Sequence, residues 1–499
     1  MGSDPKKIMK ILFVASEVVP ILKVGGIADV VSSLSGEIKK AGHDVRIVIP
    51  YYQEIEEKEV EILKEFSETE VKIGKDTQII KIFETRIQEG IPVYLVKNEK
   101  YISGGGVYLP AEDFSSITRF LFFSKAVLEV PKVINWTPDI IHSHDWQTGL
   151  IALLLKLKIS AKAEKIKVLF TIHNLLMQGR WKHEQVLEFL NLKKDAWPTL
   201  EEKVVGSYGD DFNVMQQAIL NADLITTVSP SYAREIGTKP YFARGLQKEI
   251  QARRDGLYGI LNGIDTKTYN PLTDPFVKFH YSERTLGKKL LNKIELQKKC
   301  HFTLSKNIPL FGLVSRLDVQ KGIDLVWQAL DEIVAGGAQV VMLGLGQLEY
   351  EKLLYRAAKK YPQNIASFIR FDAKLAQEIY AGSDLFLMPS RFEPCGLCQL
   401  IAMRYGTIPI VRATGGLKDT VKIVKLRRGF FGQKRIEGTG FVFSGFNINK
   451  FKKIIKRALA LYYKRGLWKK LQASAMSQDF SWTRSAQKYL ELYKKLLIT

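Results

Sequence analysis

The chain has 499 residues, of which 46% are hydrophobic, 25% charged and 11% aromatic. This balance is typical of a folded globular protein and excludes a disordered or fibrous chain. At roughly 100–200 residues per domain, the length predicts two large domains or up to four smaller ones. The sequence has no uninterrupted apolar run of about 18 residues, which excludes a transmembrane helix.

The formal net charge of +22 is unevenly distributed, because residues 421–499 carry 19 Lys and Arg but only 3 Asp and Glu. Such a segment can meet nucleic acid, an anionic membrane surface or another acidic partner. A solvated, lysine-rich helical face is the favoured interpretation. Cations and apolar residues alternate with roughly helical spacing over 450–470, which predicts one buried apolar stripe with the lysines solvated opposite. The members of this stripe are Phe451, Ile454, Ile455, Leu459, Leu461 and Leu467. Neither a zinc knuckle nor an RNA-binding sheet signature accompanies the charge, so we expect no nucleic-acid partner.

Three cysteines, an odd and small number, argue against a disulfide framework and for a reducing compartment. The opening residues MGSDPKKIMK lack the apolar core of a secretory signal. We therefore expect a cytoplasmic protein, or one of the plastid stroma if a transit peptide has been removed.

Short aliphatic segments alternate with helical patterns along the chain, beginning with a strand at 11–15 and a helix at 30–40. Strands that alternate with helices predict parallel, doubly wound α/β sheets. The later predicted strands are 45–49, 140–142, 168–172, 224–228, 310–314, 339–343, 385–388 and 408–411.

Two segments share one plan, in which a strand is followed by a loop with a lysine and glycine and then by a helix. These segments are residues 11–26 and 309–322. The stretch 261–275 between them is dense in Asn, Gly, Asp and Pro, which indicates a domain boundary. We therefore predict two Rossmann-like domains that face each other across a cleft, with ligand loops at the carboxyl ends of their strands.

The two corresponding loops carry cations and glycines that suit phosphate. Lys23 precedes the pair Gly25 and Gly26 at the start of a helix, where backbone N–H groups and the helix dipole favour an anion, although such glycines also serve packing. Arg316 and Lys321 in the second loop suit a diphosphate leaving group, unless they are simply solvated. Because no Asp-x-Asp pair is present to hold a metal, we expect these cations to do the work of Mg²⁺.

The segment His142-Ser143-His144-Asp145 resembles a metal site at first, because alternate residues of a strand share a face. A catalytic metal usually needs a third protein ligand, and the sequence identifies none, so we predict no metal. Asp145 is either a helix N-cap or a substrate contact. His173 ends another predicted strand, a favoured place for functional side chains.

Glu393 lies in a loop after the predicted strand 385–388, just before Pro-Cys-Gly and a helix. Cys395 and Cys398 have the spacing of a redox pair, but no second pair is available for zinc, and we interpret the spacing as coincidence. Thr414, Gly415 and Gly416 follow the strand 408–411 as another glycine pair suited to close approach.

Taken together, these segments resemble bacterial glycogen synthases and plant starch synthases, which are retaining glucosyltransferases of the GT-B architecture. The resemblance runs from about residue 9 to Trp482, and the segment 390–421 is its most specific part. The matching segments are KVGGIADV (23–30), HSHDWQTGL (142–150), FTIHNLLMQG (170–179), TTVSPSYAREI (226–236), LNGID (261–265), VSRLDVQKG (314–322) and SRFEPCGLCQLIAMRYGTIPIVRATGGLKDTV (390–421).

The resemblance implies roles for individual residues. Arg316 and Lys321 neutralise the donor diphosphate, and Glu393 contacts the donor glucose. His173 and Asp145 line the catalytic centre, and Asp29 is placed toward the sugar acceptor. The remaining residues of the implied donor site are Lys23, Gly25, Gly26, Asn262, Phe371, Cys395, Gly396, Leu397, Thr414, Gly415 and Gly416.

The sequence departs from the family pattern at four positions. Phe371 stands where the family usually has a tyrosine stacked on adenine, which keeps the stacking face. Gln347 replaces an aspartate after Gly-x-Gly, Gln216 replaces a lysine, and Tyr269 replaces a tryptophan. These departures bear on nucleotide choice and efficiency rather than on the reaction.

The resemblance predicts an enzyme that transfers glucose from ADP-glucose to the non-reducing end of an α-1,4-glucan with retention, without a metal or other cofactor. It predicts an N-terminal acceptor-side domain, 8–265, to which 475–499 return, and a donor-side domain, 266–474. ADP-glucose and glycogen or starch are the expected partners. The alternatives are another GT-B transferase or phosphorylase, or a catalytically silent glucan-binding protein.

Overall fold

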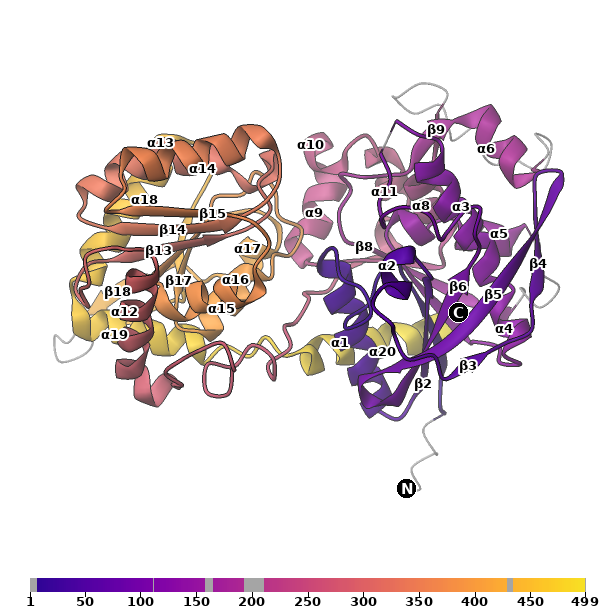
Figure 1. Cartoon of the computed structure of the whole chain (residues 1–499), viewed down its shortest axis with the longest axis horizontal. Helices are drawn as coiled ribbons and strands as arrows, with labels where there is room; N and C mark the ends of the chain where they lie inside the picture. The colour runs from indigo at the N-terminus through magenta and orange to yellow at the C-terminus, as the bar shows by residue number, and fades with distance from the viewer. Residues whose placement is uncertain (1–6, 111, 158–164, 193–210, 429–433, 499) are drawn as a thin grey trace. The chain divides into compact units, whose positions relative to one another are not determined.

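The computed structural model describes residues 7–110, 112–157, 165–192, 211–428 and 434–498. The chain divides into a first unit, Met1–Gly263 with Trp482–Thr499, and a second unit, Ile264–Ser481 (Figure 1). The expected limits of 265/266 and 474/475 therefore differ slightly from those of the structure. The reason is local: Ile264 forms a parallel β-bridge with Ser481, and its N–H donates to the Phe480 carbonyl at 2.8 Å, so both segments belong to the second unit.

The first unit contains a large sheet with helices on both faces. The strands of the unit are β1 (Lys10–Val14), β2 (Asp44–Pro50), β3 (Lys64–Glu65), β4 (Thr69–Ile73), β5 (Asp76–Ile87), β6 (Ile91–Lys97), β7 (Ile140–His144), β8 (Lys167–Ile172), β9 (Arg180–Lys182), β10 (Asp211–Asn213), β11 (Leu224–Thr227) and β12 (Leu257–Gly259). Of these, β9 and β10 pair with each other, antiparallel, in a separate two-stranded sheet. The helices of the unit include α1 (Gly26–Lys40), α2 (Gln53–Glu56), α3 (Ser115–Val127), α4 (Val130–Val133), α5 (Ile151–Lys156), α6 (His183–Leu190), α8 (Val214–Asn221), α9 (Pro230–Thr238), α10 (Pro240–Ala243), α11 (Gln247–Ala252) and α20 (Trp482–Ile498).

The sheet of the first unit has the order β12-β11-β8-β7-β1-β2-β6-β5-β3, with β4 paired to β5. Neighbouring strands from β12 to β6 run parallel, as predicted. The sequence analysis placed no strand between residues 50 and 140, where the structure adds an antiparallel edge: β5 pairs antiparallel with β3, β4 and β6. A connection of only three residues, Gln88–Gly90, joins β5 to β6, and a link so short permits only an antiparallel pair.

Alternate residues of β1 face opposite layers of the first unit, which explains its continuous apolar sequence. Leu12 and Val14 belong to the core that includes α3 and α5. Ile11 and Phe13 belong to the core that includes α1 and α20. The chain's last helix is therefore part of the first unit, in contact with α1 (Figure 1).

The second unit contains a six-stranded parallel sheet in the order β15-β14-β13-β16-β17-β20. Its strands, with a separate hairpin β18–β19, are β13 (Leu310–Val314), β14 (Gln339–Gly344), β15 (Ile365–Ile369), β16 (Leu385–Met388), β17 (Ile408–Arg412), β18 (Lys425–Arg428), β19 (Lys434–Glu437) and β20 (Phe441–Phe443). Its helices include α12 (Lys289–Lys299), α13 (Ile323–Ala335), α14 (Leu348–Lys360), α15 (Ala373–Gly382), α16 (Cys398–Arg404), α17 (Gly415–Thr420), α18 (Ile448–Tyr462) and α19 (Arg465–Met476).

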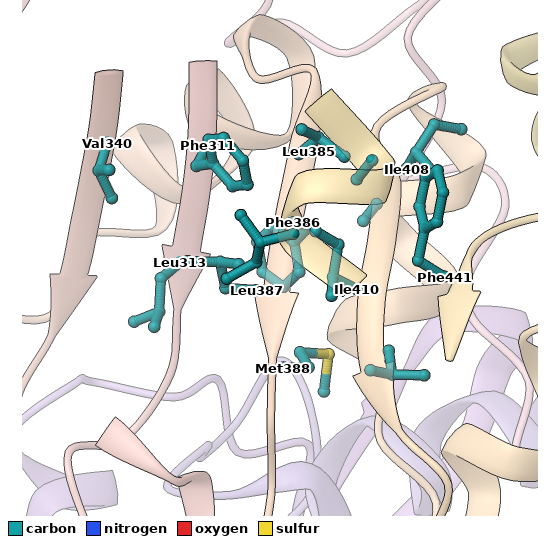
Figure 2. Close-up of a cluster of buried hydrophobic side chains, with 14 of the residues drawn as sticks. Phe311, Leu313, Val340, Leu385, Phe386, Leu387, Met388, Ile408, Ile410 and Phe441 are labelled. Carbon is teal, nitrogen blue, oxygen red and sulfur yellow. The ribbon is translucent and has the colours of Figure 1, made fainter. Parts of the chain in front are cut away.

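The second sheet is also buried on both faces. Phe311 and Leu313 of β13 pack into the core with α13, α14 and α18, and Figure 2 shows them beside the apolar side chains of the neighbouring strands. Leu310 packs on the other side with α12 and α15. This arrangement fixes the position of every strand end relative to its neighbours.

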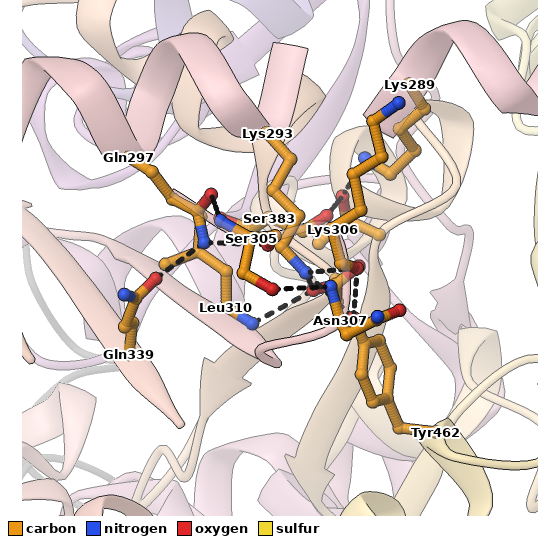
Figure 3. A network of polar contacts seen from close by, with 12 residues as sticks. Lys289, Lys293, Gln297, Ser305, Lys306, Asn307, Leu310, Gln339, Ser383 and Tyr462 are labelled. Carbon is orange, nitrogen blue, oxygen red and sulfur yellow. Dashed lines mark hydrogen bonds and ion pairs between the residues drawn. The ribbon is translucent and has the colours of Figure 1, made fainter. Parts of the chain in front are cut away.

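A polar network lies at the start of β13 in the second unit (Figure 3). Lys293 of α12 contacts the Asp384 carboxylate at 2.6 Å, with both side chains almost fully buried. Lys293 also donates to the Tyr462 hydroxyl at 2.7 Å, and Asp384 accepts from the Leu310 N–H at 2.9 Å. These contacts tie α12, β13, β16 and α18 together at the sheet end opposite the candidate loops.

The basic C-terminal segment forms two helices, α18 and α19, where the sequence suggested one continuous helical pattern over 450–470. Their break falls at Tyr463 and Lys464. The predicted apolar stripe is buried in α18, while Leu467 of α19 is only half-buried. The buried members of the stripe are Phe451, Ile454, Ile455, Leu459 and Leu461.

The strand order creates a switch point in each unit. β1 lies between β7 and β2 in the first sheet, and β13 lies between β14 and β16 in the second. At such points the loops after neighbouring strands diverge and leave a crevice in which open α/β sheets bind ligands. Within the described residues, no helix is long and apolar enough to cross a membrane.

Candidate functional site

The centre of the second unit's candidate site is an ion pair between Lys321 and Glu393. The Lys321 Nζ lies 3.0 and 2.8 Å from the two carboxylate oxygens of Glu393. Glu393 is only 5% exposed, and its carboxylate also accepts from the Ser390 hydroxyl at 3.0 Å. The sequence separates these residues widely, and the adjacent strands β13 and β16 bring their loops together.

The loop that carries Glu393 is braced from several directions. Arg391, two residues before Glu393, contacts the Asp324 carboxylate of α13 at 2.5 Å. The Arg391 guanidinium also lies 3.9 Å from the ring centroid of Phe446. The Arg412 side chain of β17 donates to the Ser390 carbonyl at 2.6 Å. These contacts brace the backbone of the loop just before Glu393.

The glycines around this loop serve close packing of the chain against itself. Gly416 donates its N–H to the Glu393 and Pro394 carbonyls at 3.1 Å, and a Cβ at Gly416 would overlap the carbonyl of Cys395. Gly415 and Gly396 have φ values of 42° and 75°, which favour glycine. The predicted donor residues Cys395, Gly396, Leu397, Thr414, Gly415 and Gly416 thus form one packed loop cluster with Glu393.

Two further predicted donor residues of the second unit are open to solvent. The Arg316 side chain is 67% exposed and lies 3.7 Å from the Asp318 carboxylate. Phe371, after β15, is 81% exposed, which is unusual for an aromatic ring and leaves its faces available for stacking. Both residues lie at the carboxyl end of the sheet, on the same side as Lys321 and Glu393.

The glycine loop of the first unit encloses a carboxylate that the sequence analysis missed. Glu17, fully buried after β1, accepts hydrogen bonds from the N–H groups of Val24 and Gly25, the latter at 2.9 Å. Burial raises the pKa of Glu17, against the lowering effect of these two hydrogen bonds. The Gly25 N–H, which the sequence left open to either a phosphate or close packing, is therefore directed at Glu17, next to the start of α1 at Gly26.

Lys23 and Asp29, predicted for the donor and acceptor sides respectively, contact each other. The Lys23 Nζ lies 2.8 Å from the Asp29 carboxylate. The side chains are 41% and 27% exposed, so both remain accessible to a ligand. Exposed ion pairs of this kind contribute little to stability, so a substrate can replace either partner at a small cost in free energy.

Asp145 follows β7 with a φ of 54° and a ψ of −178°, a sparsely populated conformation for a residue with a side chain. Its side chain does not cap the following turn, which removes the N-cap interpretation. Instead, its carboxylate accepts from the His173 N–H at 2.7 Å and more weakly from the Asn174 N–H at 3.4 Å. Burial raises the pKa of Asp145 to about 7.

His173, after β8, is brought beside Asp145 by the adjacent strands β7 and β8. Its Nε2 lies 3.0 Å from Nδ1 of His144, and burial lowers the pKa of His173 to about 3, so the ring is neutral. Asn262 is 7% exposed, and its side-chain oxygen is buried without a hydrogen-bond partner in the described part of the chain. Such an oxygen is costly to leave unpaired, and a ligand donor would satisfy it.

The described residues contain no cluster of three or more His, Cys, Asp or Glu arranged to hold a metal ion. His142 and His144 do lie side by side, with ring centroids 4.2 Å apart. Both nitrogens of His142 are already hydrogen-bonded, to Tyr493 and Thr171 at 2.7 Å each. Cys395 and Cys398 are present as thiols and not as a disulfide.

One departure from the family pattern has a visible consequence in the first unit. Gln216 of α8 donates to the buried Glu249 carboxylate at 2.8 Å. The second oxygen of Glu249 is buried and has no hydrogen-bond partner among the described residues. A lysine at this position would offer a full charge to that carboxylate, whereas the amide satisfies only one oxygen.

Comparisons with known proteins find relatives that match both units of the chain. Residues 10–252 match the family described as "Starch synthase catalytic domain", and residues 288–472 match "Glycosyl transferases group 1". A glycogen synthase of Anoxybacillus flavithermus is 42% identical over 98% of this chain and 98% of its own length. A glycogen synthase of Clostridium novyi is 40% identical over 98% of this chain and 99% of its own length.

Solved structures show the same fold. The catalytic domain of starch synthase IV from Arabidopsis thaliana, bound to ADP and acarbose, superposes with a TM-score of 0.87 at 33% identity, covering 99% of this chain and all of that one. Sucrose-phosphate synthase from Thermosynechococcus elongatus, at 18% identity and a TM-score of 0.60 over 98% and 99% of the two chains, shares the fold. The expected GT-B fold is thereby confirmed, and the chain belongs to the glycogen and starch synthase family of glucosyltransferases.

Proposed function

We propose that this enzyme transfers glucose from ADP-glucose to the non-reducing end of an α-1,4-glucan, with retention of configuration. The observation that carries the proposal is the Lys321–Glu393 pair, held at the switch point of the second sheet. A cation and a carboxylate fixed at this point suit a substrate that carries a sugar next to a diphosphate.

The departing diphosphate gains negative charge in the transition state, while the transferred sugar gains positive charge. Lys321 and the exposed Arg316 are the groups that stabilise the developing negative charge, and charges held in place before the reaction do so most effectively. Glu393 orients the sugar and supports its positive charge. The roles that the family resemblance implies for Lys23, Asp29 and Asn262 remain predictions.

Glu393 is poorly suited to be a nucleophile. Its carboxylate is engaged by Lys321 and Ser390, and both contacts lower the nucleophilicity of its oxygens. We therefore favour a front-face reaction, in which the leaving phosphate helps to deprotonate the acceptor hydroxyl. In such a reaction, the configuration is retained without a covalent glucosyl-enzyme.

We further propose that the reaction needs no metal, because Lys321 and Arg316 supply the positive charge that Mg²⁺ would bring to a diphosphate. The expected result is full activity after dialysis against EDTA. Activity that disappears on chelation and returns with Mg²⁺ or Mn²⁺ would contradict the proposal. A cytoplasmic location is also proposed, because the chain has only three cysteines, an odd and small number that argues against a disulfide framework.

The proposed reaction is tested by incubating the purified protein with glycogen and radiolabelled ADP-glucose, with UDP-glucose and GDP-glucose in parallel. We expect incorporation into glycogen from ADP-glucose, and we expect β-amylase to release the label because the new bonds are α-1,4 and terminal. Incorporation from another donor alone would correct the donor assignment. Binding to glycogen without transfer from any donor would show a catalytically silent glucan-binding protein.

A further inference from the structure

Three histidine rings form a row beside Asp145 in the first unit. His142 and His144 lie on β7, and their ring centroids are 4.2 Å apart. The ring of His173, after β8, is 5.2 Å from that of His144. His142 and His144 are at most 1% exposed, whereas His173 is half-buried at the strand end.

The inner end of the row is fixed by hydrogen bonds. His142 Nδ1 lies 2.7 Å from the Tyr493 hydroxyl of α20, and its Nε2 lies 2.7 Å from the Thr171 hydroxyl. Thr171 in turn lies 2.6 Å from the Thr226 hydroxyl. Since both nitrogens of His142 have partners, this ring serves as a rigid support against which His144 packs.

His144 has two unlike nitrogens. Nδ1 lies 3.0 Å from Nε2 of His173, so one of these two atoms carries a proton and the other accepts it. Nε2 of His144 is buried and has no hydrogen-bond partner among the described residues. Burial lowers the pKa of His142, His144 and His173 alike, so each ring is neutral and carries a single proton.

The unpartnered Nε2 of His144 indicates which ring nitrogens of His144 and His173 carry a proton. If Nε2 of His144 carried the proton, a buried N–H would have no acceptor, and orphaned buried N–H groups are rare in folded proteins. A bare nitrogen lone pair in an apolar setting is the better alternative. The proton of His144 is then on Nδ1, which donates to Nε2 of His173, and the proton of His173 is on its Nδ1.

We propose that His144 is a positioning residue that holds His173 in the Nδ1–H tautomer and thereby makes its Nδ1–H a hydrogen-bond donor. Nε2 of His173 is occupied by His144, so Nδ1 is the ring nitrogen left for a ligand. An N–H donor recognises an oxygen, and a hydroxyl group of the sugar substrate is the matching chemistry. This last step rests on the proposed glucosyltransferase function, whereas the tautomer of His173 does not.

The contact also sets the orientation of the His173 ring. The backbone of His173 is already held by the Asp145 carboxylate at 2.7 Å, and His144 adds a second point of attachment at the far end of the side chain. Two such attachments leave the ring little rotational freedom. A donor fixed in this way loses little conformational entropy when substrate binds.

The tautomer is measured by NMR on the full chain with ¹⁵N-labelled histidine, whose ring nitrogen shifts differ by tens of ppm between protonated and bare nitrogens. The chain has seven histidines, and the His173 signals are identified as those missing from His173→Asn. We expect Nδ1 of His173 to be protonated in the wild type at pH 7.5. A proton found on Nε2 would overturn the proposal, whatever the protein's activity.

Three variants at position 144 separate positioning from mere packing. Asparagine places an amide N–H near the position of Nδ1, glutamine places the same group near the unpartnered Nε2, and phenylalanine fills the volume without a donor. The Nδ1–H tautomer of His173 should persist in His144→Asn and should be lost or mixed in His144→Gln and His144→Phe. Persistence of that tautomer in the last two variants would overturn the role of His144.

Kinetics on ADP-glucose supply the second readout. We expect kcat of His144→Phe and His144→Gln to fall about tenfold, which corresponds to about 1.4 kcal/mol, with KM for ADP-glucose within about twofold of the wild type. His144→Asn should recover most of kcat. Equal losses in all three variants would show a packing role only. An inactive wild type would refute the proposed function and leave the NMR result to decide on the tautomer.

Discussion

Replacing Glu393 with alanine is expected to abolish turnover while the affinity for ADP stays the same or rises. Without substrate, the Glu393 carboxylate lies 2.8 Å from the Lys321 Nζ and so competes with any anion for that cation. Removing the carboxylate frees Lys321 for the diphosphate. It also removes the group that we propose to orient the donor sugar and to support its positive charge.

The size of each effect follows from the burial of the pair. The side chains of Lys321 and Glu393 are 17% and 6% exposed. At the effective dielectric constant near a protein surface, unit charges 4 Å apart interact by about 4 kcal/mol. If ADP recovers a quarter of such an interaction, its affinity rises about fivefold. A lost transition-state contact should cost at least about 1.4 kcal/mol, or tenfold in kcat.

The affinity for ADP is measured by calorimetry and turnover by incorporation of labelled glucose. Asp331→Asn is the matched control, because it removes an exposed carboxylate that pairs with Lys360 of α14 rather than with the Glu393 loop, and it should leave kcat nearly unchanged. Lys321→Gln should weaken ADP binding and lower turnover together. A folded Glu393→Ala variant that retains more than about a tenth of the wild-type rate would refute the role of Glu393. Weaker ADP binding in this variant would show that Glu393 mainly holds Lys321 in place.

Three further predictions concern stability and charge. Burial raises the pKa of Asp145 from 3.8 to about 7, so between these pH values the folded protein binds a proton that the unfolded chain does not. The contribution of Asp145 to stability therefore falls as the pH rises from about 4 to 7, and Asp145→Asn should flatten that part of the pH–Tm curve. Lys293→Met leaves the buried Asp384 carboxylate without its cation and should destabilise the second unit to urea by about 3–5 kcal/mol, partly recovered by adding Asp384→Asn. Glutamine at the cations of α18 should leave kcat at saturating donor within about twofold, because screening limits their action to about 8 Å; a collapse of kcat in a folded variant would place α18 in the active machinery. These cations are Lys452, Lys453, Lys456 and Arg457.

The parallel strands were predictable because each is an aliphatic run buried on both faces. The strand predicted at 385–388 has the bounds of β16, and the one predicted at 310–314 has the bounds of β13. The antiparallel edge was not predicted, although β5 alternates apolar and polar residues and Gly90 follows it at a φ of 66°. Alternation of this kind marks a strand with one solvated face and was the available signal.

The composition of the candidate site was predictable from its residues, but its contacts were not. Sequence spacing says nothing about whether Lys321 meets Glu393, because their meeting depends on β13 and β16 being neighbours in the sheet. The same holds for Asp145 and the His173 N–H, which meet because β7 pairs with β8. Glu17 was missed for a related reason: its partners are backbone N–H groups, and these leave no side-chain pattern in the sequence.

Glycine pairs at strand ends illustrate how a sound sequence argument can be incomplete. A glycine at a strand end indicates that another group approaches the backbone closely, and this group can be a phosphate or another part of the chain. In this chain the Gly25 N–H faces the Glu17 carboxylate, and the space beside Gly416 is filled by the Cys395 carbonyl. Loss of activity in Gly416→Ala would therefore follow from displacement of the loop that holds Glu393, whose carbonyl accepts from the Gly416 N–H at 3.1 Å. A measurement of substrate affinity in the folded Gly416→Ala variant separates contact with the donor from support of Glu393.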